Sequence, residues 1–293
     1  MTPLALTLVL TAAICHAAWN LVAKKAGGGS YFVLMGSLLV AVVWLPVVVW
    51  VGVSEVGHWG LAQWAILAAS ALLHVLYFRT LLHGYAVSDL TVVYPVARGS
   101  GPLLSSMGAV VVLGESISAV GVMGMLAVVG GVFLVAGGPG LLRKSHQPEQ
   151  RDRVRRGVIW GAMTGVFIAS YTVVDGYAVK IMLISPIMVD YVGNVLRIPV
   201  MLPFALRDRA GFMQAWRTQW RAALIVSILG PASYVMVLYA VRLAPLSHVA
   251  PAREVSMLFA ALVGGTLLGE SDRWLRLLGA GAIAGGVAAL ALG

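Results

Sequence analysis

Charged residues are scarce in this sequence: they make up 11% of the 293 positions, whereas 60% are hydrophobic. An average soluble domain carries roughly 25% charged and about 45 to 50% apolar residues. The single cysteine, Cys15, excludes an intramolecular disulfide and a cysteine-ligated metal site. Polar residues gather in short clusters between apolar runs of about 20 residues, the length that a bilayer requires. This composition excludes an ordinary soluble domain and favours a polytopic α-helical membrane protein.

Catalytic signatures are also missing. The chain contains no HExxH, GxSxG or Walker phosphate-loop motif and no clustered His and Cys ligands. The net charge of +9 does not indicate nucleic-acid binding, because the basic residues lie in loops between apolar segments. We therefore expect no enzyme activity, no cofactor, no metal site and no nucleic-acid partner.

The apolar runs predict ten membrane-spanning helices. The first begins at the N-terminus and lacks a preceding basic region, so we interpret it as a retained helix and not a cleaved signal. A polar stretch, residues 142–156, separates the fifth and sixth spans. The predicted spans cover residues 3–23, 31–52, 61–83, 90–113, 117–138, 157–179, 184–206, 220–242, 246–268 and 274–292.

Lys and Arg are distributed very unevenly between the two sides of such a bundle. Fourteen of them fall on the side that contains the polar linker, whereas only Lys180 and Arg242 fall on the other. Basic loops stay in the cytoplasm, so this bias predicts a cytoplasmic linker and outward-facing termini, in a bacterial inner (plasma) membrane.

The two halves of the sequence repeat one another, and five spans per half would invert the second copy. We therefore predict an all-α membrane fold of two inverted five-helix repeats, 1–139 and 157–293, joined by a basic cytoplasmic linker, 140–156. The matching pairs are Leu82 and Leu238, Leu90 and Leu246, Thr91 and Ser247, Val93 and Val249, and Pro95 and Pro251 at a separation of 156, then Arg98 and Arg253, and Glu115 and Glu270 in two LGES motifs, at 155.

These features resemble the drug/metabolite transporter superfamily, in particular its EamA-type members with two tandem domains. The likeness rests on the ten-span plan, His16, Trp19, Asn20 and Lys24 in the first span, YPVARGSGP, APAREVS and the LGES motifs. The YTVVDG stretch, residues 171–176, resembles a branch with some members associated with phosphonate utilisation. The resemblance implies a secondary carrier of small metabolites, amino acids or drugs, often an exporter, with a central cavity formed by both repeats.

Arg98 and Arg253 are the leading candidates for substrate binding, because an arginine near a span centre costs about 2.5 to 3.5 kcal/mol on insertion scales. As a pair, they would bind a carboxylate, phosphate or phosphonate through their planar guanidinium groups. The alternative is that protein carboxylates neutralise them, with Glu254, Asp175 and Asp190 as candidates. The surrounding prolines predict kinks or a gate: Pro95, Pro102 and Pro251.

Intramembrane carboxylates are candidates for proton coupling or for ion pairs. Glu254 and Asp175 are the best candidates for carrying a proton. Asp190, Asn194 and Arg197 share one helical face, where they either line the pathway or fix the packing of the bundle. The remaining candidates for substrate contact lie in the first, fourth and sixth spans: His16, Trp19, Asn20, Tyr94 and Tyr171.

Three functions remain open at this level. The first is a secondary active transporter of an amino acid, organic anion or drug-like solute that exports by alternating access. The second is a lipid or lipid-linked-sugar flippase, and the third is an uptake carrier for phosphonates or organic anions. Small-residue spacing at 157, 161 and 165, and at 281 and 285, predicts close helix packing within the chain or between two copies.

Overall fold

The computed structural model describes residues 1–27, 29–135, 148–259 and 273–293, in which helices are the regular structure and no strand occurs. Residues 140–147 of the predicted linker and Glu270 of the second LGES motif lie outside the described residues. The helices are α1 (Pro3–Lys25), α2 (Ser30–Val43), α3 (Leu45–Glu55), η1 (Val56–His58), α4 (Leu61–Val87), α5 (Leu90–Leu113), α6 (Ala119–Val135), α8 (Pro148–Lys180), α9 (Pro186–Arg207), α10 (Arg209–Leu243), α11 (Leu246–Ala252), η2 (Arg253–Val255) and α13 (Arg273–Leu292).

Six of these helices are long and apolar enough to cross a membrane: α1, α4, α5, α8, α9 and α10. The pair α2 and α3 passes the same test together but bends by 57°. Pro46 lies at the start of α3 and cannot donate a hydrogen bond to the preceding turn, which accounts for the bend. The protein is therefore an integral multi-pass membrane protein. α6 and the Leu277–Leu292 part of α13 are apolar but shorter.

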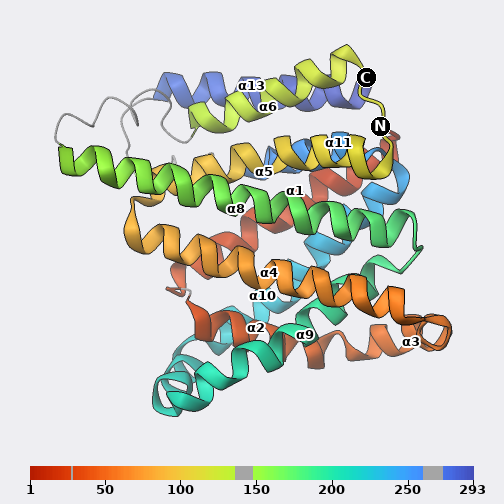
Figure 1. The fold of residues 1–293 in the computed structure, drawn as a ribbon, viewed down its shortest axis with the longest axis vertical. Coiled ribbons are helices and arrows are strands. Elements are labelled where there is room, and N and C mark those ends of the chain that lie inside the picture. The colour runs from red at the N-terminus through yellow and green to blue at the C-terminus, as the bar shows by residue number, and fades with distance from the viewer. Residues whose placement is uncertain (28, 136–147, 260–272) are drawn as a thin grey trace.

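The long helices run side by side, and successive ones point in opposite directions (Figure 1). Both termini lie at one end of the bundle, and the Met1 ammonium donates a 2.8 Å hydrogen bond to the Ala291 carbonyl. The start of α8 and the α9–α10 connection lie at the opposite end. We call these the terminal end and the linker end.

Glycines set the closest helix contacts. α6 and α13 form a pair along one edge of the bundle (Figure 1), where a Cβ on Gly131 would lie 2.6 Å from the Gly279 carbonyl oxygen. Gly157, at the start of the predicted small-residue row on α8, faces Ser88 and Val92 near α5 in the same way. The first predicted row thus serves packing within the chain.

Candidate functional site

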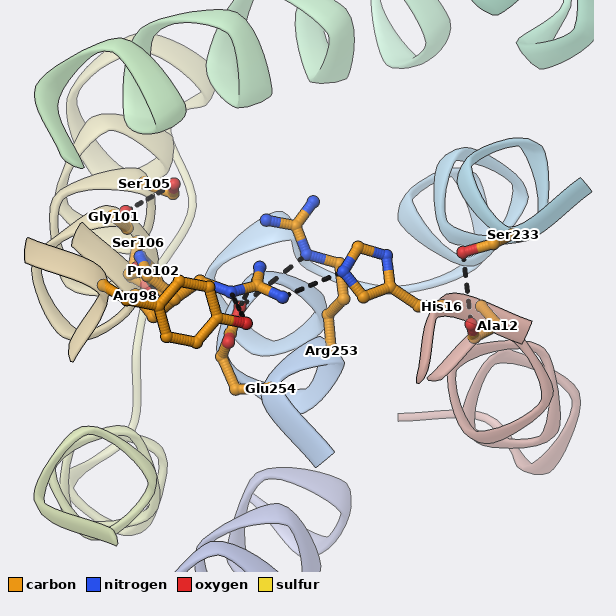
Figure 2. Close-up of polar contacts among 11 residues, drawn as sticks. Ala12, His16, Arg98, Gly101, Pro102, Ser105, Ser106, Ser233, Arg253 and Glu254 are labelled. Carbon is orange, nitrogen blue, oxygen red and sulfur yellow. Dashed lines mark hydrogen bonds and ion pairs between the residues drawn. The ribbon is translucent and has the colours of Figure 1, made fainter. Parts of the chain in front are cut away.

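Polar and charged side chains form a cluster inside the bundle that we call the arginine cluster: His16, Arg98, Arg253 and Glu254 (Figure 2), together with Tyr94. Arg98 on α5 donates from Nη2 to His16 Nε2 on α1 at 2.8 Å and from Nη1 to Glu254 Oε1 at 3.4 Å. Its Nε donates to the Tyr94 hydroxyl at 3.3 Å. The two halves of the sequence therefore meet at Arg98.

Glu254 is the carboxylate that neutralises Arg98, one of the three considered from the sequence. Its side chain is 1% exposed and that of Arg98 12%, so each charge depends on the other. Removing one partner of such a buried pair leaves an uncompensated charge, which costs about 3 to 5 kcal/mol.

Arg253 forms fewer polar contacts than Arg98. It is buried in η2, and its Nε lies 3.9 Å from Glu254 Oε1, beyond hydrogen-bond distance. Figure 2 shows its two terminal nitrogens pointing away from Glu254, and no described residue forms a hydrogen bond with them. A buried guanidinium with unused donors is suited to a carboxylate or phosphate group.

A second group of buried side chains lies on α4, α8 and α10, which we call the aromatic cluster: His74, Tyr77, Tyr171, Asp175 and Tyr234. The Tyr234 hydroxyl donates a 2.5 Å hydrogen bond to Asp175 Oδ2, while Asp175 Oδ1 has no hydrogen-bond partner. His74 stacks on Tyr171 with ring centroids 4.0 Å apart. Arg253 lies within electrostatic range of His74 and Tyr234, so the two clusters adjoin.

α9 contributes a polar face beside the aromatic cluster. Asn194 Nδ2 donates to the Asp190 carbonyl at 2.9 Å and to Asp190 Oδ2 at 3.1 Å. Arg197 lies within electrostatic range of Asp190 and Asp175, but its buried Nε has no hydrogen-bond partner. These contacts within α9 match the packing alternative, and the unused Arg197 donor leaves the pathway alternative open.

The other predicted residues of α1 lie beside His16. The His16 and Trp19 rings meet edge to face at 4.9 Å, and Asn20 Nδ2 donates to the His16 carbonyl at 2.8 Å. The indole Nε1 of Trp19 is buried without a partner. His16 is therefore the residue of this face that joins the arginine cluster.

The prolines act differently in the two halves. α5 continues as one helix through Pro95 and Pro102. In the second half, α11 ends at Ala252, directly after Pro251, and the backbone continues as the 3-10 helix η2. Arg253 and Glu254 of the arginine cluster lie in this 3-10 turn.

A network at the terminal end connects the halves a second time. Glu115 accepts from Lys180 Nζ at 2.7 Å and from the backbone N–H groups of Leu246 and Ser247 at 2.7 and 2.9 Å. Burial alone would raise the pKa of the Glu115 carboxyl, but these donors outweigh it and lower the pKa. At the linker end, the Asp89–Arg153 ion pair is about half exposed and is therefore weaker.

Sequence reasoning did not find the aromatic cluster as a whole. His74, Tyr77 and Tyr234 belong to no sequence motif. One pattern could have predicted part of this cluster: Ser70, His74 and Tyr77 are polar residues at helical spacing and share one face of α4. No group of three or more potential ligands for a metal ion occurs in the described part of the chain.

Partly unsatisfied buried charges at the centre of a multi-pass helical bundle are typical of a membrane transport protein. The model of the EamA-like transporter family matches residues 155–292, slightly less than half of the chain, and this part is similar to that family. The match confirms the resemblance to drug/metabolite transporters that the motifs indicated. Proteins of this family transport small solutes across membranes and are not enzymes.

Comparison with solved structures extends the likeness to the whole chain. One, titled only as the crystal structure of a protein, has a TM-score of 0.75 and 14% identity over 98% of both chains. At that identity the comparison shows the fold alone. No curated protein matches the chain.

Proposed function

We propose that this protein is a secondary active transporter that exports a small anionic or zwitterionic metabolite by alternating access. The observation that carries the proposal is Arg253, which is buried between the two halves and has unused guanidinium donors. A carboxylate, phosphate or phosphonate group supplies the acceptors that these donors lack. The aromatic cluster beside it would contact the rest of the solute.

The proposed architecture is ten spans in two inverted repeats, 1–139 and 157–293, with a cytoplasmic linker in an inner membrane. Helix packing supports the inversion. The first span of the first half, α1, packs against the third span of the second half, α10, and the first span of the second half, α8, packs against the third span of the first half, α4. α6 packs against α13, the last spans of the two halves. Such repeats bind substrate at their interface, where the arginine cluster lies.

Labelling of single cysteines tests this topology. In a Cys15→Ser background, Ile181→Cys at the terminal end and Gln150→Cys at the linker end introduce exposed thiols. A membrane-impermeant maleimide is expected to label Ile181→Cys in intact cells and Gln150→Cys only after permeabilisation. Labelling in the reverse order would overturn the proposed orientation.

A ligand screen tests the substrate class. The thermal stability of the purified protein is measured with carboxylates, amino acids, phosphonates, phosphates, cations or lipids. The variants Arg253→Gln and Arg253→Lys are measured in parallel. Arg221→Gln is the control, because Arg221 is exposed. Ligand at 100 times its dissociation constant stabilises by about 2.7 kcal/mol. The proposal is supported if an anion stabilises the parent and Arg221→Gln. The same anion should stabilise Arg253→Lys less and Arg253→Gln not at all. An equal response of Arg253→Gln refutes the anion site.

Proton coupling through Asp175 or Glu254 belongs to the same proposal. Asp175 and Glu254 each have one buried carboxylate oxygen without a hydrogen-bond partner, but Glu254 also neutralises Arg98, so Asp175 is the better proton carrier. In vesicles, Asp175→Asn should retain exchange of labelled for unlabelled solute and lose accumulation driven by a pH gradient. Retention of gradient-driven accumulation would remove Asp175 from the coupling step.

A lipid or lipid-linked-sugar flippase is the second candidate, supported by one observation. A largely apolar cavity of about 500 Å³ lies between α4, α5 and α8, lined by residues such as Leu104, Val166 and Val173. An acyl chain would fit such a lining. Gly108→Leu should fill part of this cavity, because even a Cβ at this position would lie 2.7 Å from the Val173 side chain. If long-chain lipids stabilise the parent but not this variant, the result favours a flippase over solute export.

A further inference from the structure

A separate cavity at the terminal end combines two cations with an apolar rim. It has a volume of about 290 Å³ and lies where α5, α8 and α10 end. Its lining is Leu113, Glu115, Val179, Lys180, Ile181, Leu183 and Arg242. None of these residues belongs to the arginine or aromatic cluster, so the cavity does not depend on the proposed function.

Both cations of the cavity have hydrogen-bond donors to offer. Lys180 uses one of its three N–H groups on Glu115, and Arg242 is exposed and has no hydrogen bond or ion pair among the described residues. The sequence count assigns only these two Lys or Arg residues to this side of the membrane. Each lies in the last turn of its helix, where a cation also interacts favourably with the helix dipole, but both of them line one cavity.

The charge balance selects the kind of anion. Lys180 and Arg242 oppose the single carboxylate of Glu115, so the cavity carries one net positive charge. A phosphodiester carries one negative charge and matches it, whereas free phosphate and phosphate monoesters carry about −1.5 to −2 at neutral pH. A diester therefore fits the cavity better than a dianion.

The rim of the cavity is apolar and exposed. Ile181 is 53% and Leu183 65% exposed, just beyond the end of α8. Leu183 has a φ of 57°, the left-handed conformation that glycine usually occupies after a helix. A leucine costs about 1 to 2 kcal/mol there, and its side chain lines the cavity. Apolar side chains beside a charged cavity match the boundary between lipid headgroups and acyl chains.

We infer that this cavity binds a monoanionic phospholipid, with the phosphodiester on Lys180 and Arg242 and an acyl chain against Ile181 and Leu183. Phosphatidylglycerol has this chemistry, while phosphatidylcholine carries a compensating cation and has no net charge to match that of the cavity. Because Lys180 also binds Glu115, which caps α11, the bound lipid lies beside a contact between the two halves.

Native mass spectrometry of the detergent-solubilised full chain tests the inference. The parent is titrated with dioleoyl phosphatidylglycerol, dioleoyl phosphatidylcholine, glycerol 3-phosphate and inorganic phosphate. The first phosphatidylglycerol molecule should bind about fivefold more weakly to Arg242→Gln, the equivalent of about 1 kcal/mol per cation near a membrane surface. Arg242→Lys should recover most of the affinity. Arg209→Gln, one of fourteen cations on the other side, should bind like the parent.

Leu183→Gly separates lipid binding from a structural role. It relieves the left-handed strain, so thermal stability should rise while phosphatidylglycerol affinity falls. Equal phosphatidylglycerol affinity of the parent and Arg242→Gln overturns the inference. Equal affinity for both dioleoyl lipids does so as well, and tight binding of inorganic phosphate or glycerol 3-phosphate would replace the lipid by a soluble anion.

Discussion

The hydroxyl of Ser106 on α5 shares its hydrogen between two carbonyl oxygens at 3.0 Å, that of Pro102 in its own helix and that of Ser247 on α11. The Ser247 carbonyl lacks its helical partner because Pro251 follows four residues later. The same arrangement recurs where Pro231 frees the Ser227 carbonyl and the Trp44 indole donates to it at 2.9 Å. In the hydrocarbon core of a membrane, no water is present to donate a hydrogen bond to such carbonyls. Each proline is thus compensated by a side chain from the other half.

Ser106→Ala should therefore cost about 1 to 2 kcal/mol, since the Ser247 carbonyl loses its donor. Ser105→Ala is the matched control, because the equally buried Ser105 hydroxyl bonds only the Gly101 carbonyl of its own helix. Unfolding in mixed micelles with increasing SDS measures both. Equal costs would show that the interhelical bond adds nothing.

Arg98→Gln should destabilise by about 3 to 5 kcal/mol, because it leaves the Glu254 carboxylate buried with Arg253 only at 3.9 Å. The double variant Arg98→Gln/Glu254→Gln removes both charges and should recover most of that loss. Thermal unfolding of the purified variants measures the difference. A double variant no more stable than Arg98→Gln would contradict the pairing.

Glu115 predicts a pH dependence. Its pKa is lower in the folded protein than in the unfolded chain, so its contribution to stability is present above the unfolded pKa, about 4.3, and is lost as the pH falls through the folded pKa. Glu115→Gln should lower stability at neutral pH by about 2 to 3 kcal/mol and converge with the parent in acid.

Asp89→Asn provides the control for Glu115, because it removes the half-exposed ion pair at the linker end. It should change stability at neutral pH by less than about 1 kcal/mol. Thermal scans of the three proteins between acid and neutral pH report the effect. A constant gap between the parent and Glu115→Gln across this range would refute the assigned pKa shift.

Gly131→Ala should destabilise the α6–α13 pair by about 1 to 3 kcal/mol, because the new Cβ would meet the Gly279 carbonyl oxygen. Its neighbour Gly130 has open space around it, so Gly130→Ala should be neutral or stabilising by up to about 1 kcal/mol. Thermal unfolding of the two variants compares one methyl group at adjacent positions. The packing argument fails if they unfold alike.

Tyr234→Phe should cost about 1 to 3 kcal/mol, since Asp175 would lose its 2.5 Å donor in the aromatic cluster. Tyr239→Phe, five residues along α10, is the control, because its hydroxyl has no hydrogen bond among the described residues. Both are compared by SDS unfolding. An unchanged Tyr234→Phe would mean that solvent already replaces this donor.

The sequence correctly predicted an all-helical membrane protein, because the length of an apolar run is a direct consequence of membrane thickness. The bend at Pro46 was not predicted, since the run 31–52 continues through it without a polar residue. Arg98, Arg253 and Glu254 stood out as costly charges in apolar surroundings. His74 and Tyr234 did not, because aromatic residues are equally common in packing.

Glu115 shows that a motif can identify a residue without predicting its contacts. The LGES repeat identified the residue, but its partners are Lys180 and the backbone N–H groups of Leu246 and Ser247, which no sequence pattern connects to it. The ten-span count, the inverted repeats and the site assignments remain predictions. Their tests are the labelling and ligand experiments above.

The α6–α13 pair also restricts how the protein can move. Carbonyl oxygens touch glycines at Gly124 and Gly286 and again at Gly131 and Gly279, with no side chain between the two backbones. Separating the helices would open a slot too narrow for an acyl chain, and the lost contacts would have no replacement. A rocking motion of one half against the other that preserves these contacts would turn about this pair, which would then be the pivot of the proposed transport cycle.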